Sequence, residues 1–226
     1  MNVCVIVPAY NEARDIAGVV KSIKELGLSV LVVDDGSVDH TAEIARNSGA
    51  DILRNEINRG KGASLIAGFH YVLSGDFDAV ITMDADGQHS PQDLPYFLQF
   101  AQEKNADIII GNRMTKVKSM PLLRLATNKF MSWLISKIAK QKIPDTQCGF
   151  RFIKCSALRK MDLKTTKYEI ESEVLIKASR LGLRIDSIPI RTIYQGEKSR
   201  INPIFDTVRF FKFIIKEILT TPQQNK

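Results

Sequence analysis

The chain has 226 residues, of which 44% are hydrophobic and 25% are charged, with 13 glycines and 8 prolines. These ordinary globular values exclude collagen-like, low-complexity and wholly disordered chains, and the length suits one domain with a lobe or extension. The net charge of +7 is unevenly distributed: residues 1–110 carry 8 Lys+Arg and 16 Asp+Glu, whereas residues 111–226 carry 24 and 9. An acidic half suits metal ions and a basic half suits phosphates or an anionic membrane, although plain solvated surface charge is the alternative.

In chain order, the first 111 residues alternate short β-branched runs with amphipathic stretches. The expected strands are Val3–Val7, Val30–Val33, Asp51–Leu53, Ala79–Met83 and Asp107–Ile110. The expected helices are Asp15–Leu26, Thr41–Ser48, Lys61–Leu73 and Pro91–Glu103, the last with Ser90 as its N-cap. This alternation predicts an α/β fold with a doubly wound, mostly parallel sheet, whose ligands lie at the carboxyl ends of the strands.

The second half of the chain is less regular. The expected helices are Leu122–Ile138, Glu171–Leu181 and Ile204–Leu219, and the expected extended segments are Phe150–Ile153 and Arg184–Ile193. An apolar stripe is predicted on the first of these helices from the four-residue spacing of Leu122, Ala126, Phe130, Leu134 and Ile138.

Cysteine content and the apolar runs bear on the cell compartment. The three cysteines (Cys4, Cys148 and Cys155) are odd in number and far apart, so we expect neither a disulfide framework nor a zinc site, and a reducing compartment. Residues 1–8 lack the basic leader of a signal peptide. No apolar run reaches the ~18 residues of a spanning helix. We therefore expect a cytoplasmic protein that is soluble or bound to a membrane surface.

Three acidic loops follow the expected strands. They read Pro8-Ala9-Tyr10-Asn11-Glu12, Asp34-Asp35-Gly36-Ser37-Val38-Asp39 and Asp84-Ala85-Asp86-Gly87-Gln88-His89. A single aspartate at a strand end is usually a turn former, but three such loops at one sheet edge favour a ligand site. Asp84 and Asp86 flank one small residue and can bind Mg²⁺ or Mn²⁺ through oxygen.

Together these loops resemble the family 2 glycosyltransferases of GT-A type fold, which is Rossmann-like. The chain is most similar to the polyprenol-phosphate glycosyltransferases, such as the dolichol-phosphate mannose and glucose synthases. The resemblance runs from about residue 3 to about residue 211 and includes the segments 145–151 and 192–199. Gly87 and Ser90 stand where mannose synthases most often have Leu and Pro, so the identity of the sugar stays open.

The resemblance implies an enzyme that transfers a hexose from a nucleotide-diphosphate sugar, of the GDP-mannose or UDP-glucose type, to a polyprenyl (dolichyl or undecaprenyl) phosphate, with metal dependence and inversion. Its catalytic residues would be Asp84, Asp86 and Arg113. The nucleotide-sugar would be bound by Pro8, Tyr10, Glu12, Asp34, Asp35, Asp84, Ala85, Asp86 and Gln88, with Asp34 or Asp35 on the base. Mg²⁺ or Mn²⁺ would be held by Asp84, Asp86 and Gln88, and the acceptor phosphate by Arg113 and Arg124. Arg191 and Lys198 are further candidates for the acceptor phosphate, with the donor diphosphate as the alternative.

The acceptor class also rests on the absence of an evident catalytic base. A sugar hydroxyl must lose a proton during attack, whereas a phosphate monoester is substantially dianionic near neutral pH. A family 2 enzyme with a soluble or cell-envelope sugar acceptor is the alternative, with its base among Glu169, Glu171 and Glu173; these acids otherwise serve a helix N-terminus. Lys61 either meets a phosphate or is structural, and ordinary salt bridges are the alternative for Arg113 and Arg124. A non-catalytic nucleotide-sugar-binding subunit is an alternative from another class.

The expected domain organisation is a catalytic domain over residues 1–202, with a nucleotide-sugar half (1–111) and an acceptor half (112–202), followed by an amphipathic helix and tail (203–226). That last helix belongs either to the core, to a membrane interface or to a dimer contact. Residues 122–138 are a second interface candidate, with Trp133 and the basic residues Lys129, Lys137 and Lys140. The expected partners are the nucleotide-sugar, the polyprenyl phosphate and the cytoplasmic face of a membrane, reached directly, through a membrane partner subunit or as a homodimer. No nucleic-acid partner is expected, since no groove-reading motif is present.

Overall fold

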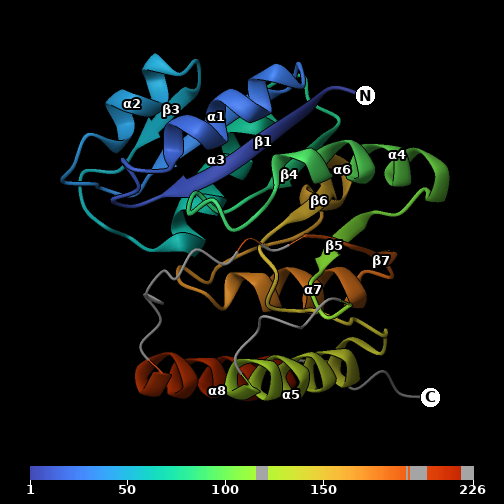
Figure 1. Cartoon of the computed structure of the whole chain (residues 1–226). Coiled ribbons are helices and arrows are strands. Elements are labelled where there is room, and N and C mark those ends of the chain that lie inside the picture. The colour runs from blue at the N-terminus through green and yellow to red at the C-terminus, as the bar shows by residue number, and fades with distance from the viewer. Residues whose placement is uncertain (116–121, 192, 194–202, 220–226) are drawn as a thin grey trace. The chain divides into compact units, whose positions relative to one another are not determined.

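A computed structural model describes residues 1–115, 122–191, 193 and 203–219 of the chain (Figure 1). Its contacts separate two compact units, Met1–Tyr194 and Gln195–Lys226. The expected functional division at residue 202 stays a prediction.

The first unit is built on one sheet with the strand order β3-β2-β1-β4-β6-β5-β7. Its strands are β1 (Val3–Ala9), β2 (Ser29–Asp34), β3 (Asp51–Arg54), β4 (Ala79–Thr82), β5 (Ile108–Asn112), β6 (Arg151–Lys154) and β7 (Ile185–Pro189). Every neighbouring pair is parallel except those that β6 makes with β4 and β5. The predicted mostly parallel α/β fold is confirmed. The carboxyl ends of all described strands but β6 therefore meet at one edge.

The central strands are apolar throughout because both faces of the sheet are covered. Val5 of β1 pairs with Val30 of β2 and with Ile81 of β4, and all three side chains are buried. Burying one such aliphatic side chain stabilises the fold by roughly 1.5–3 kcal/mol. This explains why continuous β-branched runs, and not alternating ones, indicated these strands.

The helices of the first unit cover both faces of the sheet (Figure 1). They are α1 (Ile16–Glu25), α2 (Thr41–Asn47), α3 (Lys61–Ser74), α4 (Leu94–Lys104), α5 (Leu122–Ala139), α6 (Cys155–Leu158) and α7 (Ile170–Arg180). The chain steps outward from β1 to β3 and then returns to β4, so right-handed crossovers place α3 on the face opposite α1 and α2. Short helix α6 was not predicted. Ser90 takes the predicted N-cap position, ahead of a 3₁₀ turn that begins at Pro91, but its hydroxyl donates to the Gln92 side chain and caps no backbone N–H group.

Helix α5 forms a further layer, and α7 lies between it and the sheet (Figure 1). The predicted helix is confirmed, and on its apolar stripe Leu122 is 83% exposed and Phe130 is 48% exposed. The opposite face is buried instead. Hydrogen bonds decide this orientation: the backbone N–H groups of Ile143 and Thr146 donate to Ser136 and Ser132 of α5.

The second unit contains α8 (Pro203–Leu219), whose first turns carry an ion pair between Asp206 and Arg209 at 2.5 Å. Across the described parts of the chain, no helix combines the length and the apolar character needed to cross a membrane.

Candidate functional site

The acidic motif lies directly beyond β4, at the edge where the parallel strands end. Asp84 is partly accessible, with 29% of its side chain exposed, while Ala85 is buried and Asp86 is half-buried. Oδ1 of Asp86 accepts a hydrogen bond from the backbone N–H of Gln88 at 3.0 Å, across a turn in which Gly87 has a φ of 70°. The turn therefore presents two carboxylates at the surface of this edge.

Lys61 links the acidic motif to helix α7. Its Nζ lies 2.6 Å from Oδ1 of Asp84 and 2.6 Å from Oε1 of Glu171, so one ammonium group bridges two carboxylates. Burial alone would lower the pKa of Lys61, but the two carboxylates outweigh it and raise that pKa above its ordinary value. Burial opposes ionisation of Asp84 in turn, and the charge of Lys61 still holds the pKa of Asp84 below its usual range. Lys61 and Asp84 therefore stay oppositely charged at neutral pH.

The start of α3, and with it Lys61, is positioned by Asp35. One carboxylate oxygen of Asp35 accepts the backbone N–H of Arg59 at 2.9 Å and the amide of Asn55 at 2.8 Å, and the other accepts the backbone N–H of Gly60 at 2.7 Å. Asp35 is buried. Its charge is thus used to hold the turn that precedes Lys61.

A second support for α3 comes from Glu173. Its carboxylate accepts hydrogen bonds from the backbone N–H groups of Lys164 and Thr165 at 2.8–3.1 Å and from the Thr165 hydroxyl at 2.6 Å. The held segment lies against Gly62, the second residue of α3, where it leaves no room for a side chain. Glu173 therefore fixes a loop, while Glu171 from the same helix reaches the site.

The segment 145–151 closes the other side of the motif, and it is held by Arg151. The buried guanidinium donates to the carbonyls of Cys148 at 2.7 Å, Thr146 at 2.7 Å and Glu171 at 2.5 Å. Burial lowers the pKa of Arg151 from its ordinary value. One cation thus joins the loop before β6 to the first turn of α7.

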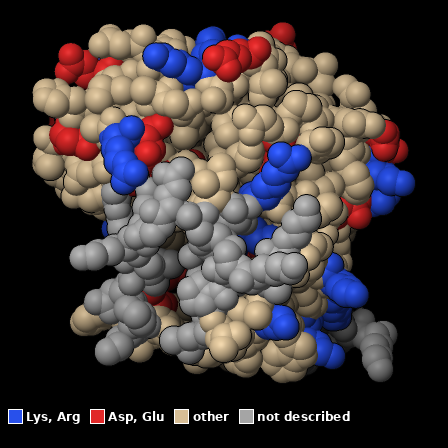
Figure 2. Space-filling model, in the orientation of Figure 1, with Lys and Arg blue, Asp and Glu red and all other residues tan. Residues whose placement is uncertain are grey.

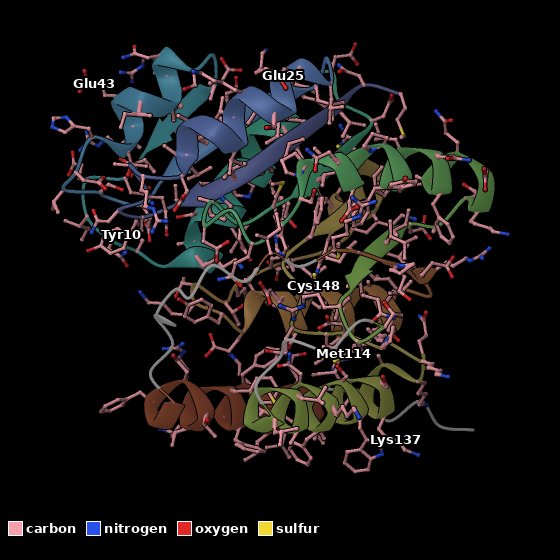
Figure 3. The ribbon with its side chains drawn as sticks, in the orientation of Figure 1. Tyr10, Glu25, Glu43, Met114, Lys137 and Cys148 are labelled. Carbon is pink, nitrogen blue, oxygen red and sulfur yellow. The ribbon has the colours of Figure 1, made fainter. Side chains whose placement is uncertain are left out.

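His89 supports Asp84 from inside. Its Nδ1 accepts the backbone N–H of Asp84 at 3.3 Å, which places the ring proton on Nε2, 4.0 Å from the Cys148 sulfur. The ring stacks on Phe150 at 5.2 Å between centroids. Burial lowers the pKa of His89 to about 4, so the imidazole is neutral at physiological pH. Figure 3 labels Cys148 in the region between β5 and α7.

Arg113, at the end of β5, is buried and paired with Asp145. Its Nε and Nη2 donate to the two oxygens of Asp145 at 2.8 and 2.9 Å, and its backbone N–H donates to the same carboxylate at 3.1 Å. This bidentate geometry is the strongest form of the Arg–carboxylate pair. An acceptor phosphate would have to approach the guanidinium from its remaining edge. The acceptor role of Arg113 stays a prediction.

The loops after β1 and β2, expected to hold the nucleotide, are joined to each other. Backbone N–H groups of Asn11 and Glu12 donate to the hydroxyls of Ser37 and Thr41 at 2.9 and 2.8 Å. Pro8, Tyr10 and Glu12 are half-buried along this junction, and Figure 3 shows Tyr10 beside the end of β1. The two loops therefore form one continuous rim along this edge of the sheet.

Asp34 differs from Asp35 in how its oxygens are used. Its Oδ1 accepts the backbone N–H of Ser37 at 3.2 Å. Nε of Arg54 lies 3.1 Å from its Oδ2, close enough for ion pairing but out of line for a hydrogen bond, and this buried oxygen has no hydrogen-bond partner within the described residues. Of the two aspartates predicted to contact the nucleotide base, Asp34 therefore has one carboxylate oxygen that accepts no hydrogen bond from the described residues.

The residues predicted on the acceptor side are only partly brought together. Arg191 lies beyond β7 at the same sheet edge, where its backbone N–H donates to Asp93 at 2.9 Å. The backbone N–H of Ile193 donates to the carbonyl of Gln88 at 3.0 Å, so this stretch runs alongside the acidic motif. The side chain of Arg124, on α5, and the whole of Lys198 lie outside the described residues.

The donor set at the acidic motif fits a hard divalent cation. Within the described residues, no group of three or more His, Cys, Asp or Glu side chains could hold a metal ion. Mg²⁺, however, is commonly bound through one or two carboxylates and takes its other ligands from substrate phosphates and water. Asp84 and Asp86 meet that requirement, and Gly149, which is packed against both oxygens of Asp84, has no side chain to cover them.

Residues 4–166 match the family model described as Glycosyl transferase family 2. The chain belongs to glycosyltransferase family 2. The matched range contains the three acidic loops together with Lys61, Arg113 and Gly149.

Two relatives of this family 2 chain have names that include dolichyl phosphate or undecaprenyl phosphate. The UDP-N-acetylglucosamine–dolichyl-phosphate N-acetylglucosaminyltransferase of Methanococcus voltae is 30% identical over 212 residues, covering 84% of each chain. The undecaprenyl-phosphate mannosyltransferase of Micrococcus luteus is 31% identical over 207 residues, covering 84% of this chain and 83% of the relative.

Among solved structures, the fold is similar to that of the glucosyl-3-phosphoglycerate synthase of Mycobacterium tuberculosis. In its complex with Mn²⁺, UDP and glucosyl-3-phosphoglycerate, the TM-score is 0.71 with 20% identity, over 99% of this chain and 81% of that chain. Another structure of that enzyme holds Mg²⁺ and UDP. The likeness supports the GT-A type fold of this family 2 glycosyltransferase.

Sequence reasoning left two residues of this family 2 site unassigned. It favoured a structural role for Lys61 and did not choose among Glu169, Glu171 and Glu173. Lys61 and Glu171 are 110 positions apart, and only the packing of α3 on α7 brings them to Asp84. The available signal was a lysine that opens a helix directly after a glycine turn at the ligand edge of the sheet.

Proposed function

We propose that the protein transfers a hexose from a nucleoside-diphosphate sugar to a polyprenyl phosphate, with Mg²⁺ or Mn²⁺ as cofactor. The observation that carries the proposal is the gathering of Asp84, Asp86 and the two joined loops after β1 and β2 at one sheet edge. Its acceptor class is supported by the relatives named for dolichyl and undecaprenyl phosphates.

On the donor side, Asp84 and Asp86 would hold the metal with Gln88 beside them, and Asp34 or Asp35 would accept a hydrogen bond from an N–H of the base. Tyr10 and Glu12 line the junction next to it. A divalent cation supplies charge stabilisation to the departing diphosphate. His89 holds the backbone of Asp84, which keeps the carboxylate facing the donor.

In the transfer, an oxygen of the acceptor phosphate attacks the anomeric carbon while the bond from that carbon to the diphosphate oxygen breaks, with inversion. The nucleoside diphosphate leaves with the electron pair of the broken bond. No proton has to be removed from a dianionic phosphate, so no catalytic base is needed.

The alternative, a sugar-hydroxyl acceptor, needs a carboxylate as catalytic base. Two of the candidates for that base already have partners in the structure. Glu171 is paired with Lys61, and Glu173 accepts hydrogen bonds from Lys164, Thr165 and Lys177. A carboxylate stabilised as an anion by several donors is a weak proton acceptor. This favours the phosphate acceptor over the sugar hydroxyl.

A polyprenyl phosphate resides in a membrane, and the outer face of α5 offers a surface for its cytoplasmic side. Phe130 and Trp133 are adjacent there, with ring centroids 6.1 Å apart, and Trp133 is 57% exposed. Lys129 and Lys137 of α5, and Lys140 directly after it, are exposed, and Figure 3 shows Lys137 on the side of α5 away from α7. Figure 2 shows lysine and arginine side chains in the region that α5 occupies in Figure 1. Exposed aromatic rings flanked by lysines suit the headgroup region of an anionic leaflet.

The test is an incubation of the protein with Mn²⁺, a polyprenyl phosphate and a panel of GDP- and UDP-sugars, followed by detection of the glycolipid. A glycolipid from at least one donor is expected, and none from the Asp86→Asn variant. Transfer to soluble sugars but to no polyprenyl phosphate would replace the proposed acceptor class. Binding of nucleotide-sugars without transfer to any acceptor would support the non-catalytic subunit instead.

A further inference from the structure

Lys61 competes with any cation that would bind Asp84. Its ammonium group lies 2.6 Å from Oδ1 of Asp84 and occupies one of the lone-pair positions of that oxygen. Two cations on one carboxylate oxygen also repel each other. A divalent metal on this oxygen is therefore favoured when Lys61 moves away from it.

We infer that Lys61 is a displaceable counter-ion, which holds Asp84 in the donor-free protein and releases it to the metal when the donor diphosphate binds. The inference rests on the proposed donor and metal chemistry. It makes metal and nucleotide binding mutually dependent, and such coupling is reciprocal by linkage.

The structure provides a place to which Lys61 can retreat. Glu171 lies in the first turn of α7 and is 9% exposed, and its backbone carbonyl is anchored by Arg151. The carboxylate of Asp84 is the more exposed partner. A flexible ammonium group with three donors can give up one oxygen and keep the other. Lys61 then retains Glu171 and turns its freed donors to phosphate oxygens.

Charge balance explains why the diphosphate is needed. In the donor-free protein, the ammonium group of Lys61 offsets part of the negative charge of the carboxylates around it. Adding a divalent cation alone brings two positive charges close to Lys61, with no new anion to offset their repulsion. The diphosphate supplies that negative charge, so the metal and the nucleotide should enter together.

The first experiment measures Mn²⁺ binding directly, from the amplitude of the EPR signal of free Mn²⁺, with no acceptor lipid present. In the nucleotide-free protein, Lys61→Met should raise Mn²⁺ affinity about tenfold, a typical coupling for two interacting sites. The matched control is Lys167→Met, which removes a positive charge beside Gly60 without removing a contact to Asp84. An equal rise in both variants would show a general field effect and overturn the inference, as would no rise in Lys61→Met.

A second variant keeps the inference falsifiable if Lys61→Met does not fold. Glu171→Gln removes the carboxylate that Lys61 would keep after it leaves Asp84. The nucleotide-free variant should therefore bind Mn²⁺ more weakly than the control Glu173→Gln, which removes a glutamate two residues further along α7. Equal Mn²⁺ affinities of the two variants would contradict a specific role for Glu171.

The third measurement is a crystal structure with Mn²⁺ and either GDP or UDP bound. Lys61 should have lost its hydrogen bond to Asp84 and kept Glu171; a Lys61 still bonded to Asp84 beside the bound metal would overturn the inference. These measurements do not depend on transfer. If no polyprenyl phosphate is glycosylated but Lys61→Met raises Mn²⁺ affinity as expected, the acceptor assignment fails and the counter-ion role stands.

Discussion

Gly149 lies directly against the carboxylate of Asp84. A Cβ at position 149 would come within 2.9 Å of Oδ2 and 3.0 Å of Oδ1 of Asp84, and within 2.8 Å of Nζ of Lys61. The Thr82 hydroxyl, donating to the Gly149 carbonyl at 2.6 Å, fixes this close approach. Glycine is thus needed here for space next to the acidic motif.

Gly149→Ala is therefore expected to lower turnover at least tenfold, because the added methyl group must push Asp84 or Lys61 aside. Overpacking of this kind costs about 1–3 kcal/mol, so the variant should fold with a reduced melting temperature. The measurement is kcat together with thermal unfolding. Gly18→Ala is the matched control, since a Cβ there meets nothing within 4 Å. Full activity in Gly149→Ala would mean that Asp84 has room to shift.

Asp86→Asn is expected to abolish turnover and to leave the melting temperature within a few degrees. The amide keeps the oxygen that accepts the backbone N–H of Gln88, but it lacks the charge that a metal ligand needs. Activity assays and thermal unfolding of the same preparation test this. If folding and activity are lost together, Asp86 is a structural turn residue.

Two substitutions of Arg113 distinguish its contribution to stability, through the pair with Asp145, from its proposed role in binding the acceptor phosphate. Arg113→Ala leaves a buried carboxylate without its partner and should lower the free energy of unfolding by roughly 3–5 kcal/mol, measured in urea. Arg113→Lys keeps the positive charge but loses the planar guanidinium, whose paired N–H donors bind a carboxylate or phosphate bidentately. It should raise the KM for polyprenyl phosphate and leave the Kd for the nucleotide-sugar unchanged. An equal loss of donor affinity would place Arg113 on the diphosphate side.

The environment of Glu173 predicts that the free energy of unfolding depends on pH. Burial alone would raise the pKa of Glu173, but hydrogen bonds from Lys177, Thr165 and Lys164 lower it below its ordinary value. The folded state therefore binds the proton less well than the unfolded state, so the stabilisation is present above the unfolded pKa and is lost as the pH falls through the folded pKa.

Glu173→Gln should lower the free energy of unfolding by about 2 kcal/mol at pH 7, the scale of hydrogen bonds to a charged group. The difference from wild type should shrink as the pH falls below about 4.5, where unfolded glutamate becomes protonated. Urea unfolding at several pH values measures both effects, with the exposed Glu103→Gln as control. A difference that does not change with pH would show that ionisation of Glu173 contributes nothing.

Trp133 is the only tryptophan in the sequence, so its fluorescence reports on α5 alone. Anionic vesicles at low salt should shift its emission to the blue, because the exposed indole enters the headgroup region. Each nearby lysine contributes roughly 1 kcal/mol, so added salt should weaken binding without abolishing it. Vesicles of neutral lipid are the control.

Deletion of residues 203–226 should weaken vesicle binding further, provided that circular dichroism shows the shortened protein to be folded. Co-sedimentation with vesicles while the Trp133 emission stays unchanged would move the contact away from α5. If the full chain ignores anionic vesicles at low salt, a membrane partner subunit becomes the better explanation of access to the lipid.

The order of strands and helices in the first half, and the convergence of its acidic loops, could be read from the sequence. Buried parallel strands are apolar along their whole length, and parallel strands end at one edge, so the loops at residues 8–12, 34–39 and 84–89 had to meet. The family and its reaction class followed from the residues in those loops.

Contacts between distant segments were decided by the tertiary structure alone. The insertion of antiparallel β6 between β4 and β5, the bridge from Lys61 to Glu171 and the pairing of Arg113 with Asp145 each join residues that no local pattern relates. Helix α5 shows the same limit, since its apolar spacing did not tell which of its faces the fold buries. Local periodicity reports what a helix can bury, but hydrogen bonds from the 143–146 loop to Ser132 and Ser136 determine which face it does bury.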